Sequence, residues 1–173
     1  MSGTWLCLQD PRDTFALFTE EFRQTHRGLH MLEQAELLAR RLHASQTDKA
    51  GRPYSEHLSA VAAGVSDDGG TEFEVALGWL HDAKEDTSVS DEALINIVGV
   101  EGLAILTVLT HGKDEPYTDH LSRVVQHPSA VRVKLADLRH NSNPARLAQL
   151  PQEQRERLEK KYAAAKAQLK AGA

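Results

Sequence analysis

The chain has 173 residues, of which 40% are hydrophobic, 26% charged and only 5% aromatic. This profile is typical of one soluble globular domain with a substantial core and a vocabulary that favours helices. The net charge of −5 argues against non-specific binding of nucleic acid through a basic surface, although a metal or a local cluster of Lys and Arg could still hold a phosphorylated small molecule.

Three features predict a cytoplasmic protein without a membrane span. Cys7 is the only cysteine, so no intrachain disulfide can form. No apolar run approaches the ~20 residues that a transmembrane helix needs. Asp10, Arg12 and Asp13 stand where a signal peptide would have its apolar segment, which argues against export.

Residues 1–30 carry scattered apolar side chains without a clean period. We predict an N-terminal extension that either packs on the domain or is loosely ordered, and a main domain at residues 31–173. Its first helix begins at Met31, and a loop containing Gly and Pro follows at residues 47–54. Ser55 is the candidate N-cap of the next helix.

The central helix is predicted at residues 72–86 with Thr71 as its N-cap, and it runs from an apolar segment into clustered ionisable side chains. Further helices are expected after Ser90 as far as Gly99, and then at about 101–110, 118–127, 131–141 and 151–169. No convincing strand and no internal repeat is present. The sequence therefore predicts an all-α bundle.

His57, His81, Asp82 and Asp137 fall on three of the predicted helices. Two imidazoles and two carboxylates, completed by water, suit Mn²⁺ or Fe²⁺ and, less well, Zn²⁺. Spacing alone does not show that they converge. In the alternative interpretation, the acids after Leu80 form a solvated helix end and His57 is an ordinary polar side chain. Three further histidines show no ligand pattern and are expected on the surface: His111, His120 and His127.

The order His…His-Asp…Asp on consecutive helices resembles the signature of HD-domain metal-dependent phosphohydrolases. Three segments resemble, in more detail, motifs of the (p)ppGpp hydrolase domains of the Rel/SpoT family. These segments are residues 43–57, 80–87 and 134–141. The likeness extends from about Leu37 to Tyr162, and it implies a compact HD-domain helical bundle.

The resemblance also implies roles for individual residues. The ligands of a single Mn²⁺ ion would be His57, His81, Asp82 and Asp137. Glu85 would be the general base, or would position the attacking water, and Asp86 would support it. The alternative for Asp86 is that it only caps the turn at Thr87.

Three residues are expected to contact substrate. Lys49 could neutralise a phosphate, and Tyr54 could stack on the substrate or support the metal helix. Asn141 could bond a phosphate or ribose oxygen, although Asn also often caps a helix end. Arg52 is expected to be solvated. Lys134 could balance the carboxylates, or extend from its helix to solvent.

Asp48 departs from the family pattern, because the family usually has an Arg there that is thought to stack on guanine. Asp48 would also repel a polyphosphate. The best single interpretation remains a guanosine-3′,5′-bis(diphosphate) 3′-pyrophosphohydrolase that acts on a small phosphorylated nucleotide. The alternatives are an HD-domain phosphatase of another nucleotide or small phosphate ester, and a catalytically idle ligand-binding module. A homo-oligomer is compatible with the sequence.

Overall fold

The computed structural model describes residues 29–48 and 51–172, and every regular element in this part of the chain is a helix. The elements are α2 (Met31–Leu42), α3 (Tyr54–Asp67), α4 (Glu72–Leu80), α5 (Ala83–Asp86), α6 (Asp91–Leu109), α7 (Tyr117–Val125), α8 (Pro128–Asn141), α9 (Pro144–Leu147) and α10 (Gln152–Ala171). The all-α prediction is confirmed. The expectations for the N-terminal segment, Cys7 and Lys49 lie outside the described residues.

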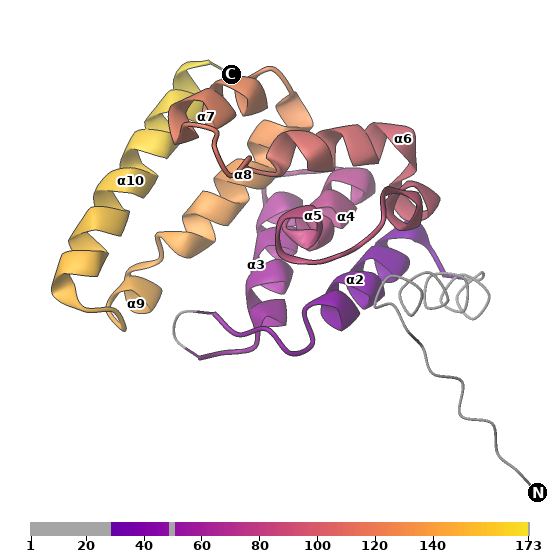
Figure 1. Cartoon of the computed structure of the whole chain (residues 1–173), viewed down its shortest axis with the longest axis horizontal. Coiled ribbons are helices and arrows are strands. Elements are labelled where there is room, and N and C mark those ends of the chain that lie inside the picture. Colours follow the sequence, from indigo (N-terminus) through magenta and orange to yellow (C-terminus); the bar gives the residue numbers. More distant parts are fainter. Residues whose placement is uncertain (1–28, 49–50, 173) are drawn as a thin grey trace, which may run out of the picture.

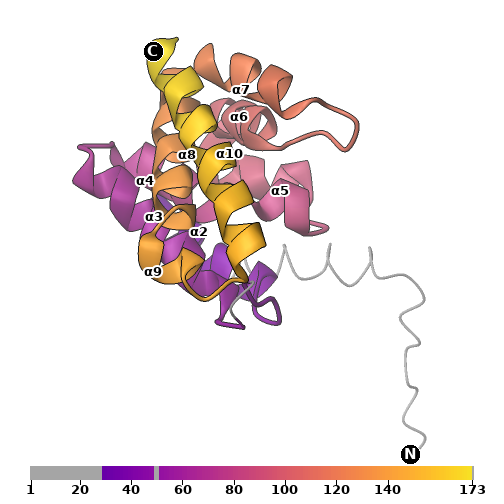
Figure 2. The same ribbon diagram turned by 90° about the vertical axis from the view of Figure 1, so that its left-hand side faces the viewer.

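Helix α4 lies at the centre of the bundle and packs against α2, α3, α6 and α8 (Figure 1). Helix α10 runs along the outside, against α7 and α8 (Figure 2). Fully buried leucines from α3, α4, α6 and α8 fill the space between these helices: Leu58, Leu77, Leu80, Leu106 and Leu138. This packing brings the N-terminus of α3, the C-terminus of α4 and the second half of α8 to one place.

The predicted N-cap Thr71 is confirmed, and the predicted N-cap Ser55 is shifted. The side chains of Thr71 and Ser90 accept hydrogen bonds from backbone N–H groups three residues on, as N-caps do. Helix α3 begins at Tyr54 with Pro53 as its N-cap, so the N-cap lies two residues before the predicted Ser55. Helix α7 likewise begins behind Pro116, and Thr118 lies within its first turn.

The prediction of one continuous helix at residues 72–86 is wrong. Helix α4 ends at Leu80, His81 and Asp82 form a turn, and α5 follows. Asp82 has φ −98° and ψ 0°, in the sparsely populated bridge region where many active-site residues lie. His81 and Glu85 therefore do not share one face of a single helix.

Helix α6 contains the predicted break at Gly99, whose φ of 70° favours glycine. By length and composition alone α6 could cross a membrane, with a mean hydropathy of 1.8. The expectation that no apolar segment approaches the length of a transmembrane helix is therefore wrong for α6, because Glu101 lowers the mean hydropathy of this helix only slightly. Inside the structure, Leu94, Val98 and Leu106 of this helix belong to the hydrophobic core, as in the core helix of a globular domain.

Candidate metal centre

Three helices bring the candidate ligands together. His57 lies in the first turn of α3, His81 directly after α4 and Asp137 in α8; all three are buried, with potential ligand atoms within 4.8 Å of one another. Asp82 Oδ2 lies 2.9 Å from His81 Nε2 and 3.6 Å from His57 Nε2. The distance from Asp137 Oδ1 is 3.4 Å to His57 Nε2 and 4.0 Å to His81 Nε2.

The hydrogen bonding of His81 suits a metal ligand. Its Nδ1–H donates to the carbonyl of Gly78 at 2.8 Å, which leaves the lone pair on Nε2. That nitrogen is buried and makes no hydrogen bond of acceptable geometry among the described residues, although the carboxylate of Asp82 lies 2.9 Å away. An unpaired buried polar atom is costly, and neighbouring ligands of an octahedral ion are about 3 Å apart. The donor set therefore fits one divalent cation.

The two carboxylates are oriented by neighbouring side chains. Tyr54 Oη donates to Asp82 Oδ2 at 2.6 Å. Asn141 Nδ2 donates to Asp137 Oδ1 at 2.5 Å, and Lys134 Nζ lies 2.9 Å from Asp137 Oδ2. Such contacts fix the geometry of metal ligands and tune their basicity. Lys134 thus balances a carboxylate, which is the first of its two predicted roles.

His140 is a member of the site that the sequence did not identify. Its Nδ1 lies 2.7 Å from Nδ1 of His57, so one ring donates to the other and Nε2 of His57 can face the carboxylates. Burial, and then the charge of Arg146, lower the pKa of His140 to about 4. The sequence did carry one indication of this role: His140 lies three residues after Asp137, and residues at this spacing share one face of a helix.

The charges at the centre are strongly coupled. Burial raises the pKa of Asp82, but the charges and hydrogen bonds of His81 and His57 together outweigh burial, and the pKa falls well below its usual range. Asp137 shows the same balance, with Lys134 as the main opposing charge. Burial lowers the pKa of His81, whereas Asp82 and Asp137 raise it to about 9. Both carboxylates are therefore ionised, and a cation entering the site would displace a proton.

Glu85 and Asp86 lie on α5, directly after the turn that carries His81 and Asp82, and are exposed to solvent. Glu85 Oε2 accepts a hydrogen bond from the backbone N–H of His111 at 3.0 Å. Asp86 Oδ2 accepts one from Gln46 Nε2 at 2.8 Å. Burial raises the pKa of Tyr117; the charge of Lys134 lowers it, and the charges of Asp137 and Glu85 raise it. Because Asp137 and Glu85 both act on Tyr117, their carboxylates lie on the same side of the bundle.

A pocket of about 340 Å³ adjoins the centre. Tyr54 and Asn141 line it and also bond the two carboxylates. The pocket is lined by Gln46, Thr47, Asp48, Tyr54, Asn141, Arg146, Leu147, Leu150, Leu158 and Tyr162. Its apolar wall could hold a planar or aliphatic group while the polar side faces the candidate ligands.

Asp48 is neutralised by two arginines. Its Oδ2 lies 3.0 Å from Arg146 Nη1 and 3.3 Å from Arg52 Nη2. The expected repulsion of a polyphosphate is therefore weakened, and Arg52 is engaged in an ion pair rather than simply solvated. His120 is also corrected, because it is fully buried and not a surface residue.

No family model matches the chain. The chain is 35% identical, in an alignment of 111 residues that covers 58% of this chain, to a Synechocystis protein named probable guanosine-3′,5′-bis(diphosphate) 3′-pyrophosphohydrolase. It is 31% identical, in an alignment of 122 residues that covers 64% of this chain, to the bifunctional (p)ppGpp synthase/hydrolase SpoT of Escherichia coli K12. The chain spans only 15% and 17% of the length of these two relatives.

The fold is similar to that of a solved structure of a metazoan ortholog of SpoT that hydrolyzes ppGpp, with a TM-score of 0.62. The two chains are 20% identical, and the match covers 82% of this chain and 93% of the other. At this level of identity the likeness shows a shared fold.

Proposed function

We propose that this chain, whose predicted resemblance to the Rel/SpoT family the relatives above confirm, is a metal-dependent pyrophosphohydrolase. Its substrate would be guanosine-3′,5′-bis(diphosphate). Water would attack the phosphorus that is bonded to the ribose 3′ oxygen. The bond between that phosphorus and the 3′ oxygen would break, and GDP and pyrophosphate would leave. The observation that carries the proposal is the convergence of His57, His81 and Asp137 within 4.8 Å, with ionised Asp82 2.9 Å from His81, beside a pocket that shares Tyr54 and Asn141 with this cluster.

The metal would be held by His57, His81, Asp82 and Asp137. This mixed set of imidazole and carboxylate favours Mn²⁺, with Fe²⁺ as an alternative and Zn²⁺ as a poorer fit. A bound divalent cation polarises a phosphoryl oxygen and lowers the pKa of a coordinated water. The charge balance supports a divalent cation, since a cation that displaces the proton of His81 would neutralise the carboxylate charge that Lys134 does not offset.

Glu85 would take a proton from the attacking water or hold that water in line with the phosphorus. Its exposed carboxylate is oriented by the backbone N–H of His111, so it is available to a water at the mouth of the site. A positioned general base is worth roughly 10²–10⁴-fold in rate. Asp86, fixed by Gln46, would support Glu85 by orienting the same water.

The pocket would receive the nucleoside. Its leucine wall suits a base, and Asn141 lies where a ribose or phosphate oxygen could meet both the pocket and Asp137. Tyr54 would bound the pocket while it supports Asp82. Lys49 would contact a phosphate, as its place in the sequence motif suggests. The catalytic domain would comprise residues 31–173, and the protein would be cytoplasmic.

A second candidate keeps the reaction type and changes the substrate. Asp48 replaces the Arg that is usual in the family, and its carboxylate is paired with Arg52 and Arg146. A pocket altered at this position would suit another nucleotide or a small phosphate ester. A catalytically idle binding module is less well supported, because both the candidate ligands and Glu85 are present.

The test is hydrolysis of ppGpp beside a panel of nucleoside mono- and triphosphates, in Mn²⁺ and then in EDTA. Release of GDP and pyrophosphate that EDTA abolishes is the expected result. Turnover of another nucleotide with ppGpp untouched would favour the second candidate. No turnover and no bound metal would overturn the enzymatic proposal.

A further inference from the structure

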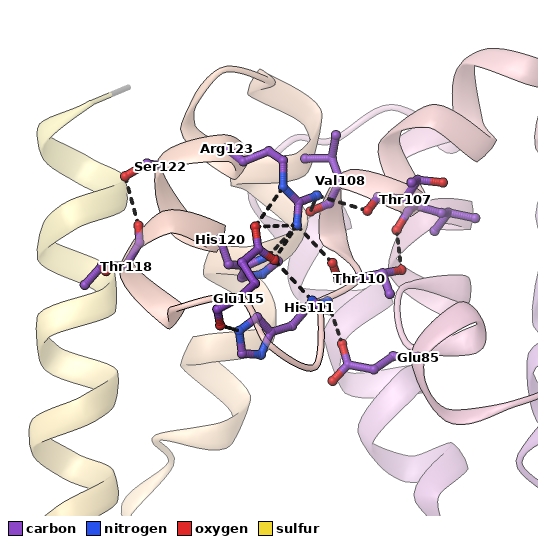
Figure 3. A network of polar contacts seen from close by, with 12 residues as sticks. Glu85, Thr107, Val108, Thr110, His111, Glu115, Thr118, His120, Ser122 and Arg123 are labelled. Atoms are coloured by element: carbon purple, nitrogen blue, oxygen red, sulfur yellow. Dashed lines mark hydrogen bonds and ion pairs between the residues drawn. The ribbon is translucent and has the colours of Figure 1, made fainter.

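The carboxylate of Glu85 depends on a distant part of the chain for its position. Glu85 is exposed, and a free Glu side chain explores several rotamers, so restricting it to one rotamer costs conformational entropy. The backbone N–H of His111, 26 residues later, donates to its Oε2 at 3.0 Å (Figure 3). His111 begins the loop between α6 and α7, so Glu85 can be only as well ordered as that loop.

The loop is fastened by the guanidinium of Arg123, which lies on α7. Arg123 Nη2 lies 2.7 Å from Oε2 and 3.0 Å from Oε1 of Glu115, and Nε lies 3.1 Å from Oε1. This forked ion pair is of the geometrically specific, charge-assisted kind. Figure 3 shows Arg123 between the end of α6 and the loop, with Glu115 beside it.

The same guanidinium also binds the C-terminal end of α6. Nη1 donates to the carbonyls of Thr107 (3.1 Å) and Val108 (3.0 Å), and Nη2 donates to that of Thr110 (3.2 Å). These carbonyls lie at or near a helix end, where they lack helical partners, and a basic side chain there is favourable. Arg123 therefore joins α7, the end of α6 and the loop by one planar group.

Within the loop, two further bonds fix the backbone next to Glu85. Glu115 Oε2 accepts from the N–H of Gly112 at 3.1 Å, and His111 Nε2 donates to the carbonyl of Glu115 at 2.8 Å. Glu115 thus holds His111, whose N–H meets Glu85, and Gly112, the residue after it. His120 packs beneath, with Nδ1 3.3 Å from Arg123 Nη2, and is fully buried.

We propose that Arg123 is a positioning residue for Glu85. With Glu115 it fixes the loop so that the N–H of His111 holds the carboxylate in its working rotamer. This inference rests on the proposed function, in which Glu85 acts on the attacking water. Arg123 itself contacts neither the candidate ligands nor the lining of the pocket among the described residues, so its loss should leave metal binding intact.

The test compares Arg123→Met with Arg132→Met in the full chain. Arg132 is a matched control: its side chain is 37% exposed against 36% for Arg123, it pairs with Glu74 at 3.2 Å, and it donates to the carbonyl of Asp68 at 2.7 Å. Both variants lose an ion pair; Arg123→Met also loses three carbonyl contacts and Arg132→Met one, and only Arg123 contacts the loop.

The first readout is hydrogen exchange at the His111 amide, which needs no turnover. We expect exchange at least about 10-fold faster in Arg123→Met and unchanged in Arg132→Met. The second is kinetic: kcat falls about 10- to 100-fold in Arg123→Met, while KM and bound Mn²⁺ are unchanged. Arg123→Lys, which keeps the charge but loses the fork, should lie between the two.

Equal His111 exchange in the two Met variants would overturn the proposal, and so would equal kcat. Loss of metal in Arg123→Met would also contradict it, because the effect would then be a general loss of structure. If the unaltered chain hydrolyses nothing, the proposed function fails and the catalytic consequence fails with it, whereas the exchange data still decide whether Arg123 fixes the contact to Glu85.

Discussion

The candidate ligand cluster and the carboxylate of Glu85 are held in different ways. His57, His81 and Asp137 are buried, and side chains or carbonyls of their own helices and close neighbours fix them. Glu85 is exposed and is oriented by a loop amide 26 residues away. Metal affinity should therefore resist changes outside the centre, whereas turnover should respond to changes in the α6–α7 loop.

The largest effect is expected from a substitution in the candidate ligand cluster. Asp82→Ala removes a proposed ligand and leaves Tyr54 Oη without its 2.6 Å acceptor, so we expect no bound metal and no hydrolysis. Metal content after dialysis and turnover in Mn²⁺ are the measurements. Asp68→Ala, which removes an exposed carboxylate paired with Arg139, should retain both properties; full activity of Asp82→Ala would refute the ligand assignment.

The next effect separates the two regions. Glu85→Ala should keep one metal per chain and lose turnover by roughly 10²–10⁴-fold, because only the water-directing carboxylate is removed. Calorimetric titration with Mn²⁺ alongside steady-state kinetics measures both. Glu101→Ala, an exposed change on α6, is the control. Loss of metal in Glu85→Ala would make Glu85 a ligand and erase the distinction.

A smaller effect concerns support of the cluster. Tyr54→Phe removes the hydroxyl that donates to Asp82 and leaves the ring in place, so Mn²⁺ affinity should fall by about 10- to 100-fold. Tyr162→Phe, another change of a residue that lines the pocket, should bind Mn²⁺ as the unaltered chain does. Equal affinities of the two variants would mean that the Tyr54 bond does not influence the metal.

The smallest expected effect concerns the support beneath the loop. Burial, and then the charge of Lys134, lower the pKa of His120 from 6.5 to about 4. Between these values the unfolded chain binds the proton and the folded chain does not, so stability is complete above pH 6.5 and declines as the pH falls towards 4. The contribution is on the order of 1–3 kcal/mol.

Thermal unfolding of the unaltered chain and of His120→Gln, at pH 7.5 and at pH 5, measures this contribution. The loss of stability between the two pH values should be smaller in the variant, which cannot take up the proton. His127→Gln changes an exposed histidine and should behave as the unaltered chain. An equal pH dependence of all three proteins would show that His120 titrates normally in the folded state.

The resemblance of the ordered motifs predicted which residues meet at the centre, whereas helical periodicity alone did not show that they converge. The break after Leu80 was not predictable from local preferences, because Ala83 to Asp86 are acceptable helix residues and tertiary contacts such as Tyr54 to Asp82 favour the turn.

Contacts made by backbone groups leave no mark in the sequence. The N–H of His111 that meets Glu85 would be present with nearly any residue at that position. Burial of His120 was hidden for a different reason: its spacing to Leu121 and Val124 on α7 fits the inner face, but His is common both inside proteins and on their surfaces.

The most direct test of the central claim is anomalous diffraction from crystals of the full chain grown with Mn²⁺. We predict one manganese peak, bounded by Nε2 of His57 and His81 and by the carboxylates of Asp82 and Asp137, with Glu85 outside bonding distance. A peak between Glu85 and Asp86, or no peak at saturating Mn²⁺, would contradict the assignment of the buried cluster as the metal centre.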